Sequence, residues 1–248
     1  QNVVEEIETL KPSRGVYGIA FMDDMFTLSK KRTLQICELM KEKKVNCIWG
    51  ATIRADTVTY ELLSAMHDTG CVIIFLGVET GEQEILDKIR KGETIEQMKR
   101  IFKWTSSIGI DTVASVALGL PGETKKSIAK TIEYVNSLKP DHAIFALATP
   151  YPGTGFYNEA VEKGWVVDDD WSNYTLFKPL IETSELTTDD LKTLLKYAYK
   201  TFHINPTWLA RRLIREARVA ATKYGMRLYF KNLAWFMRAL KRNFFILR

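Results

Sequence analysis

The amino-acid sequence alternates short apolar runs with longer amphipathic segments over its first 150 residues. Each apolar run is rich in Val, Ile and Phe and short enough to be a buried β-strand, whereas the segments between them place apolar residues at helical spacing. This regular alternation is typical of parallel sheets, because each crossover between parallel strands needs a long connection, usually a helix. The five predicted strands are residues 16–23, 46–53, 72–79, 112–120 and 142–149.

Polar residues and tight turns follow every predicted strand, and this distribution bears on the type of sheet. In an open doubly wound sheet the ligand contacts gather at one switch point, whereas in a (β/α) barrel they come from the carboxyl ends of all the strands. No Gly-x-Gly-x-x-Gly turn follows the first strand, which argues against a dinucleotide-binding fold. We therefore predict an α/β fold, a partial barrel of parallel strands, because five strands are too few to close an eight-stranded one.

The second part of the chain lacks this alternation. Gly164 ends a helical segment, an irregular stretch continues to about Ser184, and Thr187 precedes two acidic residues as an N-cap would. Helices are then expected near 188–203, 206–224 and 227–244. The sequence therefore predicts two regions, a partial barrel over 1–160 and an irregular and basic helical extension over 161–248.

Composition limits the class of protein. With 248 residues, of which 46% are hydrophobic and 26% are charged, the chain can bury the core of one large domain or two small ones. No apolar run approaches the roughly 18 residues of a membrane-spanning helix. Three cysteines, at spacings that match no disulfide or metal framework, suit a reducing compartment, so we expect a cytoplasmic protein.

The net charge of +5 is unevenly distributed along the chain. After Lys200, eleven arginines and lysines are interleaved with aromatic and aliphatic residues, and Glu216 is the single acidic residue. One explanation is a solvated basic face on helices that pack against the barrel. The alternative is a basic amphipathic surface that binds an anionic membrane and makes the protein membrane-associated. Charge alone is also compatible with a nucleic-acid surface, but we expect no nucleic-acid partner.

Charged residues after the first two strands are candidates for ligand binding. Asp23 and Asp24 follow the first strand, where side-chain alternation lets one of them face the barrel axis while the other could cap the next helix. Ser29 is better placed for that cap. Arg54 could bind a carboxylate while Asp56 holds its guanidinium in place, or the two could form a structural ion pair at the barrel rim.

Glu79 ends a strand of consecutive apolar residues, where an unpaired buried charge would cost several kcal/mol. At the carboxyl end of a barrel strand its two oxygens could instead accept hydrogen bonds from the hydroxyl groups of a ribose or from an ammonium group. A salt bridge to Arg54, or a place beside a helix N-terminus, is the structural alternative.

Two turns that combine Gly with Pro, at 118–124 and 149–155, could bring backbone groups close to the edge of an adenine. The histidines show no metal-ligand spacing, and we expect them to be structural. They are His67, His142 and His203.

Taken in order, the motifs FMDDMFT, LGVETGEQEILDKIRKGET, LGLPGET and ATPYPGTGFY resemble those of the radical S-adenosylmethionine (radical SAM) enzymes. The branch that they resemble is the large group usually found behind a cobalamin-binding domain, which includes methyltransferases and the anaerobic cyclase of bacteriochlorophyll synthesis. The resemblance runs from about Asn2 to Tyr157. It implies an open, TIM-like (β/α)6 barrel with S-adenosylmethionine lying across the strand ends.

The resemblance also implies roles for individual residues. Asp23 and Asp24 occupy positions that contact the methionine amino group, and Arg54 lies near the methionine carboxylate. Glu79 occupies a position that faces the ribose or the methionyl end. The backbone that packs against the adenine corresponds to Leu118 and Gly119 and to the segment from Ala148 to Pro150.

In such enzymes, one-electron reduction of S-adenosylmethionine by a [4Fe–4S] cluster gives a 5′-deoxyadenosyl radical that takes a hydrogen atom from the substrate. The implied cofactors are therefore S-adenosylmethionine and the cluster. The implied partners are a reductant protein such as flavodoxin or ferredoxin and a small-molecule or lipid-like substrate. With cobalamin in the parent protein, methyl transfer to an unactivated carbon is the expected reaction, and cyclisation or another radical step is the alternative.

One feature of that family is missing from the sequence. Its cluster is held by three cysteines of a C-x3-C-x2-C loop after the first strand, whereas Cys37, Cys47 and Cys71 fall in a predicted helix and at two predicted strand starts. We expect that the chain begins just past the cluster loop, lacks the first strand and is inactive alone. No catalytic residue and no metal ligand is predicted within it.

Two other classes of protein stay open. A barrel lyase or aldolase would need a Schiff-base lysine or a metal triad at a strand end, and the predicted strand ends offer neither. The second class is a non-catalytic module on a degenerate barrel, which binds S-adenosylmethionine or a nucleotide, or a membrane surface.

Overall fold

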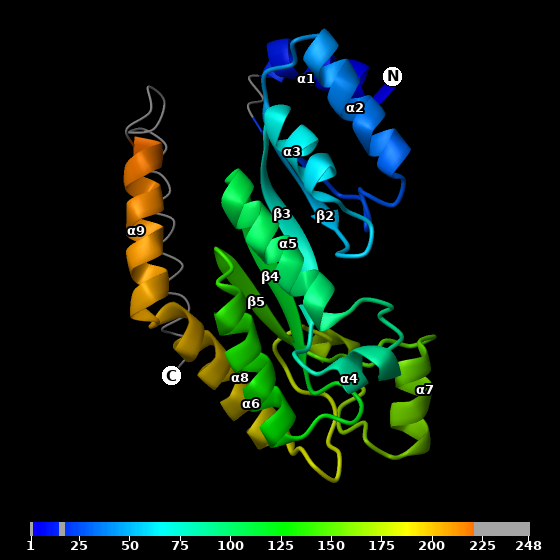
Figure 1. Cartoon of the computed structure of the whole chain (residues 1–248). Helices are drawn as coiled ribbons and strands as arrows, with labels where there is room; N and C mark the ends of the chain where they lie inside the picture. Colours follow the sequence, from blue (N-terminus) through cyan, green and yellow to red (C-terminus); the bar gives the residue numbers. More distant parts are fainter. Residues whose placement is uncertain (1, 15–17, 221–248) are drawn as a thin grey trace. The chain divides into compact units, whose positions relative to one another are not determined.

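A single parallel sheet organises the first part of the molecule (Figure 1). The computed structural model describes residues 2–14 and 18–220. Its five strands are hydrogen-bonded in chain order, so that each strand pairs with the next one along the sequence. The predicted parallel sheet is confirmed, and each strand lies within or overlaps its predicted run. The strands are β1 (Gly18–Phe21), β2 (Ile48–Ile53), β3 (Cys71–Glu79), β4 (Asp111–Leu118) and β5 (His142–Leu147).

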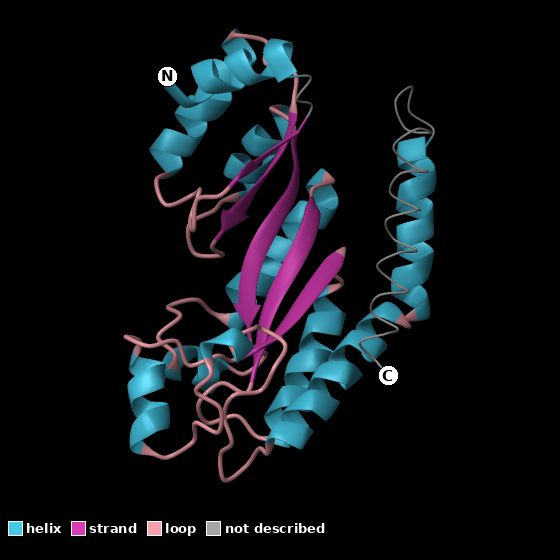
Figure 2. Ribbon diagram, turned by 180° about the vertical axis from the view of Figure 1, so that it is seen from behind, coloured by secondary structure: helices cyan, strands magenta, loops and turns pink. Residues whose placement is uncertain are grey.

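Helices connect the strands and cover one face of the sheet. In Figure 1 helices α3, α5 and α6 lie in front of the strands, whereas in Figure 2, seen from behind, the strands face the viewer. The short helix α4 was not among the predicted elements. The helices are α1 (Asn2–Arg14), α2 (Lys30–Glu42), α3 (Tyr60–Asp68), α4 (Gln83–Lys88), α5 (Ile95–Ile108), α6 (Lys125–Leu138), α7 (Gly155–Glu162), α8 (Thr188–His203) and α9 (Pro206–Ala220).

The helix starts follow from side-chain capping. The Ser29 hydroxyl accepts a hydrogen bond from the Arg32 N–H, as predicted for the N-cap of α2. Thr187 and Asp190 exchange side-chain to backbone bonds at the start of α8, which confirms the second predicted cap. Thr94 and Thr124 cap α5 and α6 in the same reciprocal manner.

The two faces of the sheet differ in burial because successive side chains of a strand point to opposite sides. The helix-covered face carries fully buried residues such as Trp49, Ile74 and Phe145. On the other face Phe75 and Ile144 are 37% and 39% exposed. The hydrophobic core therefore lies between the strands and the outer helices, and the inner face of the barrel-like sheet is open.

The chain divides into two compact units, Gln1–Leu195 and Lys196–Arg248. The irregular segment after α7 belongs to the first unit, since the Leu147 N–H donates to the Leu176 carbonyl and Val166 bridges to Ile181. The predicted division into 1–160 and 161–248, drawn where the strand–helix alternation ends, stays a prediction. The helix predicted at 227–244 lies outside the described residues.

Within the described ranges, no helix is both long and apolar enough to cross a membrane.

Candidate functional site

The carboxyl ends of the five strands lie along one edge of the sheet because all five are parallel. In Figure 2 strands β3 to β5 run toward a group of loops at the lower end of the view. Every charged residue that the sequence singled out follows or ends a strand at this edge. Asp24 is exposed, and Asp23 lies 3.4 Å from the guanidinium of Arg32 on α2, so the two carboxylates border solvent.

The guanidinium of Arg54, just after β2, is fixed by three hydrogen bonds. Its Nε and Nη2 donate to the two carboxylate oxygens of Asp56 at 3.0 and 2.8 Å, and Nη2 also donates to the Lys91 carbonyl at 2.7 Å. The hydrogen bond to Arg54 holds the pKa of Asp56 below its usual value, and that to Asp56 raises the pKa of Arg54. The ion pair between Arg54 and Asp56, which both interpretations of the sequence allow, is therefore present. The N–H groups of Nη1 take part in none of these three hydrogen bonds.

Glu79, the last residue of β3, adopts a left-handed backbone conformation with φ of 60°. Such a φ is uncommon for a residue other than glycine and costs of order 1–3 kcal/mol, so its surroundings must hold it in place. The Lys91 ammonium donates to the Glu79 carboxylate at 2.9 Å. A methyl group on Gly77 would lie against the ends of the Glu79 and Lys91 side chains, so a larger residue there would displace this pair.

Glu93 is the buried centre of this charge network. Its side chain is fully buried, and its Oε1 accepts a hydrogen bond from the Ala55 N–H at the end of β2. Its Oε2 lies 3.3 Å from Lys91 Nζ and 3.7 Å from Arg54 Nη1. Glu93 therefore joins the end of β2 to the Lys91–Glu79 pair at the end of β3, and it faces two cations that offset its desolvation.

A second buried carboxylate, Glu123, binds the ends of β3 and β4. One oxygen accepts the N–H groups of Gly119 and Leu120 at 2.8 and 3.0 Å, and the other accepts the Thr80 hydroxyl at 3.1 Å. Thr80 also lies 3.0 Å from the hydroxyl of Thr131 on α6. Among the described residues no cation forms a salt bridge with this carboxylate, and burial raises its pKa to about 7 although its hydrogen bonds act in the opposite direction.

Neither Glu93 nor Glu123 was singled out from the sequence, and Lys91 was also missed. A repeated tripeptide could have identified both carboxylates, because Gly-Glu-Thr occurs at 92–94 and at 122–124. In each copy the glycine has a positive φ and the threonine caps the next helix. The glutamate carboxylate accepts a hydrogen bond from a backbone N–H just after a strand, that of Ala55 or Gly119. The repeat is a turn that ties the start of a helix to the carboxyl end of the sheet.

The backbone segments expected to pack against an adenine lie side by side at the ends of β4 and β5. The Ala148 N–H donates to the Leu118 carbonyl at 2.8 Å, and the Gly119 N–H is bound by Glu123. Gly119 has a φ of 88°, and Pro150 is buried. Both N–H groups therefore already have hydrogen-bond partners within the chain.

The cysteines do not assemble into a metal site. All three are buried, on α2, just before β2 and at the start of β3, and burial raises the pKa of Cys71 to about 12. Among the described residues no group of three His, Cys, Asp or Glu side chains could hold a metal ion. The cluster ligands that the resemblance calls for therefore have no counterpart in this part of the chain.

A cavity of about 430 Å³ lies at the opposite end of the sheet, beside the amino ends of β2 and β3. Lys41 and Asp68, 3.2 Å apart, lie on its wall with Lys44 and Cys47. Its lining contains none of the strand-end carboxylates. We place the functional site at the carboxyl ends, where the buried charges and the strained Glu79 gather, as in barrel enzymes.

Replacement of Glu123 by glutamine should remove a pH dependence of stability. The folded state holds a proton on Glu123 between the ordinary pKa of 4.5 and the raised value of about 7. The unfolded chain has lost that proton, so the unfolding free energy of the wild type falls as pH rises through this window. The unfolding free energy of the wild type, measured relative to that of Glu123→Gln, should fall by about 2–3 kcal/mol from pH 5 to pH 8.

Urea unfolding of both proteins across this pH range measures the difference. Glu133→Gln, an exposed change on α6, is the matched control for removing a carboxylate near this site. A constant difference between wild type and Glu123→Gln across the range would contradict the prediction.

Lys91 and Glu93 should be energetically coupled. Removal of either partner leaves the charge of the other buried or half-buried without its counter-ion. The single changes Lys91→Met and Glu93→Gln should therefore both destabilise the fold. The double variant should be more stable than the sum of the single effects by about 1–3 kcal/mol. The exposed pair of Lys99 and Glu96, 2.6 Å apart, provides a control cycle with an expected coupling below about 0.5 kcal/mol. Equal coupling in the two cycles, measured by urea unfolding, would show that the buried network does not stabilise this edge.

Known proteins are similar to this chain in sequence and in fold. The family model of the Radical SAM superfamily matches residues 1–135. An uncharacterized methyltransferase from Pyrococcus horikoshii is 32% identical over 206 residues, which cover 83% of this chain and 45% of that protein. The anaerobic magnesium-protoporphyrin IX monomethyl ester cyclase of Rubrivivax gelatinosus is 28% identical over 84% of this chain and 38% of its own length. This chain thus spans less than half the length of either relative.

Solved structures agree on the fold. The radical S-adenosylmethionine methyltransferase TsrM from Kitasatospora setae, solved with cobalamin and a [4Fe–4S] cluster, superimposes with a TM-score of 0.59 over 64% of this chain and 33% of its own, at 21% identity. The coproporphyrinogen III oxidase HemN from Escherichia coli, also a radical SAM enzyme, gives 0.56 over 81% of this chain and 44% of its own, at 17% identity. The partial TIM-like barrel expected from the sequence is confirmed, and the chain belongs to the radical SAM superfamily.

Proposed function

We propose that this chain is the S-adenosylmethionine-binding barrel of a radical SAM enzyme. The observation that carries the proposal is the charge network at the carboxyl edge, in which Lys91 and Glu93 lie between Arg54 and Glu79 on neighbouring strands. An amino-acid moiety needs a cation for its carboxylate and carboxylates for its ammonium group, and a ribose needs acceptors for its hydroxyls. All of these groups occur along this single edge.

The residue roles follow the strand order. Asp23 and Asp24, at the solvent border of β1, would accept hydrogen bonds from the methionine ammonium. Arg54 would bind the methionine carboxylate through Nη1, since Asp56 and the Lys91 carbonyl hold its other donors. Glu79 would accept a ribose hydroxyl. The adenine would lie against the backbone of Leu118 and Gly119 and of Ala148 to Pro150.

The cluster itself does not fit the described residues, because the three cysteines are buried and the described residues contain no group of three side chains that could hold a metal ion. When bound in a radical SAM enzyme, a reduced [4Fe–4S] cluster supplies the electron that cleaves S-adenosylmethionine. We propose that its ligands lie outside the described part of this chain and that the chain alone binds S-adenosylmethionine without cleaving it. A reductant protein such as flavodoxin or ferredoxin would serve the whole enzyme.

We propose methyl transfer as the reaction of the whole enzyme, with cyclisation as the second candidate. One of the relatives above is named a methyltransferase and the other a cyclase. Cobalamin is proposed as a further cofactor because the structure of TsrM, which shares this fold, contains it. The substrate would be a small or lipid-like molecule that reaches the open inner face of the sheet.

Arg54 should distinguish S-adenosylmethionine from an analogue without the amino acid. The variant Arg54→Gln should weaken binding of S-adenosylmethionine about tenfold, because it loses a charge-assisted hydrogen bond. It should bind methylthioadenosine, which lacks the methionyl carboxylate, as the wild type does. Isothermal titration of both ligands measures the effect, with Arg100→Gln on the outer surface of α5 as the control.

The two ligands also separate the proposal from its alternatives. Equal loss of affinity for both ligands would remove the role assigned to Arg54. Failure of the wild type to bind either ligand would contradict the proposed function.

A second candidate function rests on α9. Leu209, Leu213 and Ile214 are 44%, 62% and 56% exposed on a helix that also carries Arg211 and Arg212. Exposed apolar side chains next to arginines are typical of helices that lie on anionic membranes. We propose that this helix contributes to binding of such a membrane, either of the enzyme itself or of a non-catalytic module.

Liposome flotation tests the membrane proposal. The full chain should float with vesicles of phosphatidylserine and phosphatidylcholine and stay in solution with phosphatidylcholine alone, since the attraction is electrostatic. The double change of Leu209 and Leu213 to Ser should reduce flotation at least fivefold. If the chain remains unbound to both vesicle types, or the variant floats as well as the wild type, α9 is not a membrane surface.

A further inference from the structure

Three aromatic side chains, two of them stacked on each other, lie together at the surface beside the end of β5. The indole of Trp171 is stacked on the ring of Tyr174, with 5.9 Å between centroids and 24° between planes. The Tyr151 ring is tilted against Tyr174, with 6.0 Å between centroids and 57° between planes. Trp171 is 72% exposed and Tyr151 is 44% exposed, whereas Tyr174 is half-buried. Large apolar rings so exposed on one surface indicate a surface that is covered in function.

The loop that carries this stack is held in one conformation. The Asp168 carboxylate accepts a hydrogen bond from the Lys178 ammonium at 2.7 Å. It also accepts hydrogen bonds from the Asn173 side-chain amide at 3.0 and 3.2 Å. The Asp170 side chain accepts the Ser172 N–H at 2.9 Å. Ring positions fixed in advance lose little conformational entropy when a ligand arrives, which favours binding.

The stack lies at the substrate end of the sheet. The Leu147 N–H at the end of β5 donates to the carbonyl of Leu176 at 2.7 Å, so the aromatic loop extends from the strand end. Tyr151 itself follows β5 by four residues. The same strand end carries Ala148 and Pro150, which the proposed function places against the adenine.

The charge around the stack is negative. Asp168, Asp169 and Asp170 precede Trp171 directly, and in the described part of the chain one cation, Lys178, forms a salt bridge with this group, through Asp168. These carboxylates disfavour an anionic ligand and attract a cationic one. Aromatic faces add to this preference, because they attract cations through their quadrupoles.

We propose that Trp171, Tyr174 and Tyr151 form a stacking platform for a flat aromatic ring system that is neutral or positively charged. Stacking on exposed aromatic side chains is tolerant of ring type, whereas the three aspartates select by charge. The assignment of that ring to the enzyme's substrate rests on the proposed function. The ring-binding site itself depends only on the described geometry.

Titration with two probes that share one ring system tests the platform. Proflavine carries the acridine ring as a cation, and acridine carboxylate carries it as an anion. The full chain should bind proflavine at least tenfold more tightly than acridine carboxylate, as measured by fluorescence anisotropy at low salt. Asp169→Asn should reduce this ratio about threefold without affecting the fold, because the side chain is exposed.

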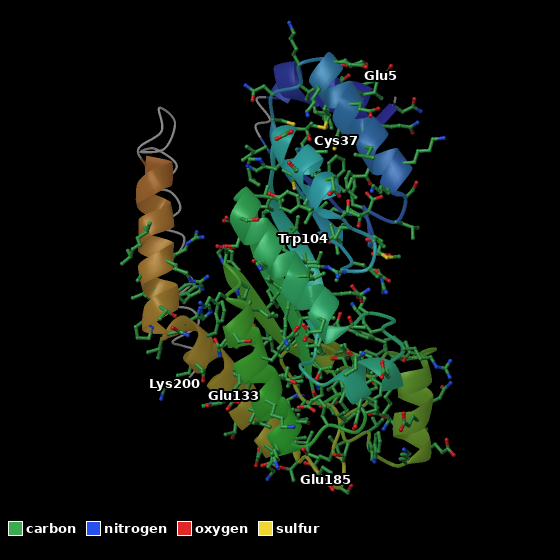
Figure 3. All side chains as sticks on the ribbon, in the orientation of Figure 1. Glu5, Cys37, Trp104, Glu133, Glu185 and Lys200 are labelled. Carbon is green, nitrogen blue, oxygen red and sulfur yellow. The ribbon has the colours of Figure 1, made fainter. Side chains whose placement is uncertain are left out.

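Variants of the stack locate the binding. Trp171→Ala should weaken proflavine about tenfold, and Trp171→Phe should restore binding to within threefold of the wild type. Trp104→Ala is the matched control, since Figure 3 places Trp104 on α5 in the helical layer, where it pairs with Tyr60. Equal effects of Trp171→Ala and Trp104→Ala, or equal binding of the two probes, would overturn the proposal. So would a dimer that Trp171→Ala abolishes, because a second copy would then cover the platform.

The same variant separates this inference from the proposed function. Trp171→Ala should bind S-adenosylmethionine as the wild type does, because the stack lies outside the strand-end charge network. If proflavine binding is independent of Trp171 while S-adenosylmethionine binds, the platform is wrong and the barrel function stands. If S-adenosylmethionine does not bind while proflavine depends on Trp171, the platform stands and the proposed function falls.

Discussion

A buried carboxylate must find donors or cations, and this requirement shapes the carboxyl edge of the sheet. Glu93 meets it with the Ala55 N–H and two cations, and Glu123 meets it with two backbone N–H groups and a hydroxyl. Each carboxylate therefore connects the loop that precedes a helix to the carboxyl end of a strand. Two Gly-Glu-Thr turns on successive loops thus set the positions of the strand ends relative to one another.

This arrangement has a consequence for ligand binding. The Arg54 guanidinium and the Glu79 carboxylate are fixed before any ligand arrives, one by Asp56 and the other by Lys91. A site whose charges are already oriented avoids the reorganisation cost of binding. The strained φ of Glu79 and the glycine at position 77 are local costs of placing a carboxylate at the strand end.

The sequence predicted the fold well because local signals carry it. The five apolar runs, the helical spacing between them and the caps at Ser29 and Thr187 all depend on neighbouring residues, and all are confirmed. The partners in the charge network depend on contacts between distant residues, such as Ala55 with Glu93. A pattern of single residues does not reveal such pairs, so Lys91, Glu93 and Glu123 were missed even though the motifs containing all three were noticed. The roles of Asp23, Asp24 and Arg54 rest on resemblance and remain predictions.

A crystal structure of the full-length protein with S-adenosylmethionine tests the central claim most directly. The account predicts that the ligand lies across the carboxyl ends of β1 to β5. Arg54 Nη1 should lie within hydrogen-bond distance of its carboxylate, and Glu93 should keep its contacts with Ala55 and Lys91. A ligand in the cavity beside Lys41 and Asp68, or one that displaces Lys91 and Glu93 from each other, would contradict the claim that this edge is a preformed binding site.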